Sequence, residues 1–99
     1  MIDLSKIIGF DWDVGNSQKN LKHSVSTAES EQVFFNAPLL LLEDFKHSQL
    51  ERRFHTLGKI DNERLLPISF ALRNNGKTIR VISARVMHKK ERSIYEQTT

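Results

Sequence analysis

The sequence has no cysteine, only two prolines and only four glycines among its 99 residues. The lack of cysteine excludes a disulfide framework and a zinc site built from thiolates. The longest apolar run, Pro38–Leu42, is far shorter than the roughly 20 residues that span a bilayer. The N-terminus also lacks the basic and apolar regions of a signal peptide. We therefore expect a cytoplasmic protein that does not enter a membrane.

The length predicts one domain over residues 1–99. A domain of this size buries only about 60–65% of its unfolded surface. Such a core has little room to enclose a large cofactor, so an active site on an open sheet face or in a shallow groove is expected. The four histidines lack metal-ligand spacing, and the sequence has neither a glycine-rich phosphate loop nor a serine nucleophile elbow. We expect neither a cofactor nor a metal.

Charge is distributed unevenly along the chain. Residues 1–50 hold four Lys/Arg and seven Asp/Glu, a net −3, whereas residues 51–99 hold eleven Lys/Arg and five Asp/Glu, a net +6. Seven of those eleven cations are arginines, the side chain best suited to bidentate phosphate contacts. The basic half indicates a polyanion such as RNA, or an acidic protein partner, although a solvated surface can have the same composition.

The pattern of apolar and turn residues predicts an α+β domain. It has an N-terminal strand and two helices, then a four-strand antiparallel meander, then a C-terminal helix. The first strand lies in residues 7–12, the helices in 16–22 and after the capping box Ser26–Glu29, and the last helix in 88–97. The meander strands are residues 39–42, 53–59, 65–72 and 78–84, with Glu43–Gln49 as a charged loop and Asn74-Asn75-Gly76 as a hairpin turn. We expect the helices to lie on one face of the sheet.

Two constellations could carry chemistry. Lys22-His23 joins an imidazole, which can exchange protons near neutral pH, to a cation that can hold phosphate; the alternative is cations at a helix C-terminus. Arg80 and Arg85 lie in one β-prone run, Arg80-Val81-Ile82-Ser83-Ala84-Arg85. Strict alternation places them on opposite faces, so they share a phosphate only if a bulge or the strand end redirects one. The alternative is two salt bridges, to Glu51 or Glu91.

Two further clusters have ordinary structural explanations. Glu51-Arg52-Arg53-Phe54-His55 is also typical of a solvated edge strand. Lys89-Lys90-Glu91-Arg92 with Tyr95 places a phenol one turn from Glu91, as an ordinary solvated helix face also does.

Taken together, these segments resemble the BrnT toxins of bacterial type II toxin–antitoxin pairs, over residues 10–96. The matching stretches, in order, are Phe10-Asp11-Trp12-Asp13; Gly15-Asn16 with Lys19-Asn20; Lys22-His23-Ser24-Val25-Ser26; Val33-Phe34-Phe35-Asn36; His47-Ser48; Glu51 with Arg53-Phe54; Leu57-Gly58; Arg64-Leu65-Leu66; Ile79–Arg85; and Lys90-Glu91-Arg92 with Tyr95-Glu96. The resemblance implies a RelE-like ribonuclease fold and RNA cleavage that blocks translation. It also implies inhibition by a BrnA-like ribbon-helix-helix antitoxin, in a heterotetramer that contacts operator DNA only through the antitoxin.

Metal-independent RNA cleavage needs a base for the 2′-hydroxyl, cations for the phosphorane and an acid for the leaving oxygen. Arg85 and Arg80 are the first candidates for holding the phosphate, followed by Lys22 with His23. Arg53 is a further cation, and Tyr95 a further proton carrier. The family commonly has two residues between the asparagine and the Lys-His pair, whereas here only Leu21 separates Asn20 from Lys22. A non-catalytic interaction protein that binds an acidic partner or nucleic acid is therefore the alternative function.

Overall fold

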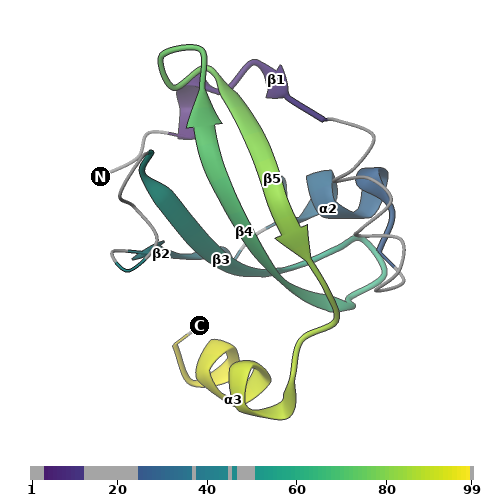
Figure 1. The fold of residues 1–99 in the computed structure, drawn as a ribbon. Helices are drawn as coiled ribbons and strands as arrows, with labels where there is room; N and C mark the ends of the chain where they lie inside the picture. Colours follow the sequence, from purple (N-terminus) through teal and green to yellow (C-terminus); the bar gives the residue numbers. More distant parts are fainter. Residues whose placement is uncertain (1–3, 13–24, 37, 45, 47–50, 99) are drawn as a thin grey trace.

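The computed structural model describes residues 4–12, 25–36, 38–44, 46 and 51–98. Its elements, in order, are the 3-10 helix η1 (Leu4–Lys6), β1 (Gly9–Phe10), α2 (Thr27–Val33), β2 (Leu40–Asp44), β3 (Arg53–Lys59), β4 (Leu65–Arg73), β5 (Thr78–Ala84) and α3 (Lys89–Thr98) (Figure 1). The α+β class is confirmed, and the helix expected over residues 16–22 lies outside the described residues. Within the described ranges, no helix is long and apolar enough to cross a membrane.

The strands form one five-stranded sheet in the order β1-β5-β4-β3-β2. β2 to β5 are the predicted antiparallel meander, in which each strand pairs with the next along the chain. The short β1 adds to the edge in parallel with β5, through Gly9 opposite Thr78 and Phe10 opposite Ile79. Glu43 and Asp44, which the sequence placed in a loop, instead extend β2, with Asp44 opposite Arg53.

The turn between β4 and β5 shows the backbone conformation that its residues predict. Asn74, Asn75 and Gly76 have φ of 54°, 57° and 83°. Asparagine and glycine tolerate this left-handed region better than other residues do. The Asn74 amide also donates to the Thr78 hydroxyl at 3.1 Å, which ties the turn to the first residue of β5.

The predicted capping box starts α2. The Ser26 hydroxyl accepts from the Glu29 backbone N–H at 3.1 Å, and the Glu29 carboxylate accepts from the Ser26 N–H at 2.9 Å. The hydrogen bond from the Ser26 backbone, with help from Arg64, holds the pKa of Glu29 below its ordinary value despite partial burial. The two side chains thus accept from the backbone N–H groups of Glu29 and Ser26, and the helix begins where the sequence indicates.

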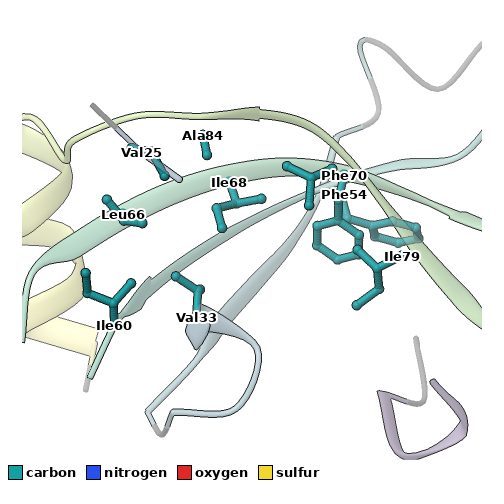
Figure 2. Close-up of a cluster of buried hydrophobic side chains, with 10 residues drawn as sticks. Val25, Val33, Phe54, Ile60, Leu66, Ile68, Phe70, Ile79 and Ala84 are labelled. Atoms are coloured by element: carbon teal, nitrogen blue, oxygen red, sulfur yellow. The ribbon is translucent and has the colours of Figure 1, made fainter. Parts of the chain in front are cut away.

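The main hydrophobic core lies between α2 and one face of the sheet. It contains Val25, Val33, Phe54, Ile60, Leu66, Ile68, Phe70, Ile79, Val81 and Ala84. Figure 2 shows Val33 of α2 below the sheet residues Leu66 and Ile68. Gly58 of β3 permits this close approach, because a Cβ there would lie 2.8 Å from Val33 Cγ1 and 3.1 Å from Leu39 Cδ1.

The second helix packs against the other face, so the expectation that the helices share one face was wrong. Tyr95 of α3 packs with Leu57, Leu65, Met87 and Leu40 in a separate cluster. Leu57 and Leu65 alternate with the core residues Phe54 and Leu66 along their strands, and therefore point away from α2. Apolar residues on both faces of β3 and β4 require cover on both faces, and α3 supplies it on the second.

We expect Gly58→Ala to destabilise the protein by about 1–3 kcal/mol, because the added methyl overpacks the contact with Val33. The measurement is urea unfolding at equilibrium. Gly9→Ala is the control, because nothing lies within 4 Å of a Cβ at that position. Equal stability of the Gly58 variant and wild type would show that α2 can shift without cost.

Candidate functional site

A β-bulge redirects the end of β5. Ser83 pairs with Ser69 and Val81 pairs with Phe70, so Ile82 has no partner on β4. Before the bulge Ile79 and Val81 face the core, and after it Ala84 does. Ser83 and Arg85 therefore lie on the same face as Arg80, opposite Ile79 and Val81. The strict alternation expected from the sequence was wrong here, and the bulge that could redirect an arginine is present.

The face opposite α2 carries most of the polar side chains of the sheet; we call it the polar face. Its described polar side chains are Asp44, Arg53, His55, Lys59, Ser69, Arg73, Thr78, Arg80, Ser83 and Arg85. Four arginines and three carboxylates meet there, since Glu51 pairs with Arg73 at 3.3 Å and Glu91 pairs with Arg85. Three of the predicted site residues, Arg53, Arg80 and Arg85, are thus brought onto one surface.

Arg53 and Arg80 flank a small residue on the central strand. Arg53 is opposite Ala71, and Ala71 is opposite Arg80, so the three lie in one row across β3, β4 and β5. Strands are about 4.8 Å apart, which sets the two arginine backbones about 10 Å from each other. Alanine leaves space between two long side chains whose guanidinium groups can donate to one phosphate.

The next row along the same face contains a histidine with a partner on each ring nitrogen. Leu42, His55, Ser69 and Ser83 are successive partners across β2 to β5. His55 Nε2 lies 2.9 Å from Asp44 Oδ2, and His55 Nδ1 lies 2.8 Å from Ser69 Oγ. Because a carboxylate only accepts, Nε2 carries the proton, and Nδ1 of a neutral ring accepts from the serine hydroxyl.

A shallow groove of about 290 Å³ runs along this part of the polar face. It is lined by Leu42, His55, Leu57, Pro67, Ser69, Ser83, Arg85, Glu91 and Ile94. The strands supply one wall and α3 supplies the other. The groove therefore joins the row that contains His55 to Arg85, one of the two arginines that the sequence analysis ranked first.

Arg85 is held by a bidentate ion pair at the start of α3. Its Nη1 and Nη2 donate to Glu91 Oε1 and Oε2 at 2.7 and 2.8 Å. Glu91 Oε1 also accepts from the backbone N–H of His88, which caps the helix. Burial raises the pKa of Glu91, but the Arg85 hydrogen bonds and the His88 N–H outweigh it, so the pKa lies below its ordinary value.

The Tyr95 side chain contributes to the packing of α3 against the sheet. Its ring is buried in the α3 cluster, and its hydroxyl donates to the Pro38 carbonyl at 2.6 Å. Burial, and then the charge of Glu63, raise its pKa above the ordinary value. The described structure thus uses this phenol to dock α3, away from the row of arginines. Lys22 and His23 lie outside the described residues.

The sequence indicated the arginines but not the complete histidine row. Asp44 was assigned to a loop, and Ser69 was placed only within the strand of residues 65–72, with no role in a site. The cluster of residues 51–55 did mark His55, and alternation along residues 65–73 places Ser69 on the face of Arg73. Extending the strand of residues 39–42 by two residues would have brought Asp44 to the same surface.

Comparison with known families identifies the chain. A family model described as the ribonuclease toxin, BrnT, of type II toxin–antitoxin systems matches residues 12–91. The chain belongs to the BrnT family. The matched segment contains every described residue of the polar face and ends before Tyr95. A search of curated proteins finds none that matches this chain.

Glu91→Gln should lower stability at neutral pH by about 1 kcal/mol, because it removes the charge of a partly exposed bidentate pair. Since the pKa of Glu91 is lowered on folding, the carboxylate stabilises the protein above its ordinary pKa of 4.5. That contribution is lost as the pH falls below 4.5 through the folded value. Thermal unfolding from neutral to acid pH should therefore show the two proteins converging in acid. A constant difference in Tm would contradict the pairing.

Proposed function

We propose that the chain is a metal-independent endoribonuclease that cleaves RNA on the polar face, inhibits translation and acts in the cytoplasm as a single toxin domain of RelE-like fold. Membership of a family of ribonuclease toxins supports the reaction class. The bulge at Ile82 supports this location, because it brings Arg85 onto the surface that already holds Arg53 and Arg80.

The arginines suit the charge that develops during RNA cleavage. When a ribose 2′-hydroxyl attacks the adjacent phosphorus, negative charge grows on the phosphorane oxygens. Guanidinium groups stay protonated and can stabilise that charge by paired hydrogen bonds. We assign Arg53 and Arg80 to the phosphate between their strands, and Arg85 to the groove at the end of β5.

The other three residues that the sequence suggested, Lys22, His23 and Tyr95, have different roles in this proposal. Lys22 and His23 stay candidate cation and proton carrier, with no geometry assigned to them. Tyr95 is left out of the reacting groups, because its hydroxyl already donates to the Pro38 carbonyl inside the α3 cluster.

Arg80→Ala and Arg85→Ala should each reduce RNA cleavage by about 10²–10³, the usual loss for removing one group that stabilises charge in the transition state. Induced expression of wild type should arrest growth and protein synthesis, whereas expression of either variant should not. Cleavage of cellular RNA by purified proteins, with EDTA present, measures the effect directly.

Two control variants separate catalysis from stability. Arg64→Ala removes an arginine that pairs with Glu29 beside α2, so its cleavage should equal that of wild type. Glu91→Gln weakens the ion pair of Arg85 but leaves the guanidinium in place, so substantial cleavage should remain. Full cleavage by Arg85→Ala would return Arg85 to a structural role. Normal growth with soluble wild-type protein present would favour the alternative, a non-catalytic protein that binds an acidic partner or nucleic acid.

We also propose an antitoxin of the BrnA-like ribbon-helix-helix type. Family membership supports an antitoxin partner, and the arginines of the polar face suit acidic segments, which associate fast and in a salt-sensitive way. Two toxins would join through the antitoxin dimer, and only the antitoxin would contact operator DNA.

Co-expression with the neighbouring reading frame should give a complex of two toxins and two antitoxins, because each subunit of the antitoxin dimer covers one polar face. Light scattering on the purified mixture measures its mass. Rising salt should slow association more than it speeds dissociation. A mixture that contains only free monomers would contradict the proposed assembly.

A further inference from the structure

Asp44, His55 and Ser69 form a continuous hydrogen-bonded chain across three neighbouring strands. The contacts are 2.9 Å from Asp44 Oδ2 to His55 Nε2 and 2.8 Å from His55 Nδ1 to Ser69 Oγ. An imidazole fixed by a carboxylate on one nitrogen, with a hydroxyl on the other, is the arrangement by which proteins activate an O–H group.

The exposure of Asp44 and His55 fits this use. The Asp44 side chain is 9% exposed, whereas the His55 side chain is 46% exposed and lines the groove. The carboxylate is thus enclosed where it can orient the ring and stabilise an imidazolium. The ring itself remains open to a ligand that lies on the polar face.

Ser69 is poorly placed to be the nucleophile. β4 lies between β3 and β5, so the backbone N–H groups around Ser69 point along the sheet plane toward its neighbours. A serine nucleophile needs N–H groups directed at the developing oxyanion, and a flat sheet face does not provide them. The Ser69 hydroxyl instead shows where a donor to Nδ1 is accommodated.

We infer that His55 is the general base that takes the proton from the ribose 2′-hydroxyl, with Asp44 as the positioning residue that holds its ring. This inference rests on the proposed ribonuclease function and deepens it. RNA brings its own hydroxyl to the groove, beside the arginines that hold the phosphate. The substrate hydroxyl occupies the donor position that Ser69 fills in the free protein.

The reaction balances without a further cofactor. His55 Nδ1 accepts the 2′-hydroxyl proton as O2′ forms a bond to phosphorus and the bond from phosphorus to O5′ breaks. The leaving O5′ takes a proton from water, and the resulting hydroxide takes the proton from the imidazolium. The products are a 2′,3′-cyclic phosphate and a 5′-hydroxyl, and His55 returns to its neutral form.

Several charged groups face His55 from the surrounding elements. Asp44 of β2 contacts it directly. Arg53 lies two residues along β3 on the same face, Arg85 lies at the end of β5, and Glu91 lies across the groove on α3. The neighbours on β4 and β5 in its own row are the neutral Ser69 and Ser83. These are the described groups whose charges can act on His55 in the groove.

The test compares His55→Gln with wild type on a random-sequence oligoribonucleotide. Glutamine can still bond to Asp44 and Ser69 but cannot take the proton. We expect kcat/KM to fall by about 10²–10⁴, the usual contribution of general acid–base catalysis, and the acid limb of its pH profile to disappear. Affinity for the 2′-deoxy oligonucleotide of the same sequence, which lacks the attacking hydroxyl, should stay unchanged.

Matched variants control for the loss of a histidine or a carboxylate elsewhere. His88→Gln changes an exposed histidine at the start of α3. Glu43→Gln changes the neighbour of Asp44; the Glu43 carboxylate pairs with Arg52 on the other side of β2. Both should keep the wild-type rate and pH profile. Asp44→Asn should lower kcat more than it changes KM, because it disturbs the ring and not the binding of RNA.

The outcomes separate this inference from the proposed function. If His55→Gln keeps the rate and the acid limb while Arg80→Ala loses cleavage, the base is elsewhere and the ribonuclease assignment stands. If wild type yields no cyclic phosphate ends from RNA, both are overturned. If His55→Gln melts early, His55→Ala is assayed below its Tm with added imidazole. Restored cleavage supports the inference, and no restoration by the folded variant overturns it.

Discussion

The unpaired residue Ile82 determines which side chains the end of β5 presents to the polar face. Without the bulge, the residues after Val81 would alternate in the opposite sense, and Ser83 and Arg85 would point into the core beside α2. A guanidinium in that core would require an ion partner in an apolar environment, at a cost of several kcal/mol. The bulge instead turns Ala84 inward, where it is fully buried. One extra residue thus places an alanine in the core and an arginine beside the groove.

Carboxylates hold much of the polar face in position before any ligand binds. Glu91 orients Arg85, Glu51 pairs with Arg73, and Asp44 orients His55. Each pair limits the rotamers of a long or rotatable side chain, and this lowers the entropy lost on binding. The same carboxylates compete with a phosphate for the arginines. A polyanion must therefore exchange with them, which makes electrostatic association sensitive to salt.

Local signals in the sequence predicted most of the fold. The capping box at Ser26, the asparagine turn before β5 and the bounds of β3 and β5 depend on near neighbours in the chain, and the structure confirms them. Pairing of β1 with β5 joins residues about 70 positions apart, and no local pattern encodes such a contact. The bulge lacks a glycine or proline to mark it, so the face of Arg85 could be predicted only as one of two alternatives. Asp44 was missed because two acidic residues at the end of an apolar run look like a loop.

The two faces of the sheet explain how so small a chain can have both a core and a reactive surface. The face under α2 carries the main hydrophobic cluster, with Thr56 as a buried polar residue whose hydroxyl donates to the Leu40 carbonyl. The other face needs cover only around Leu57 and Leu65, and the short α3 supplies it through Tyr95 and Met87. In the described part of the chain, most of the other side chains on that face are polar. Because Glu91 caps α3 and also holds Arg85, the helix that completes the fold and the wall of the groove depend on the same carboxylate. A change at the site therefore alters the docking of α3, and stability and cleavage must be measured together to separate them.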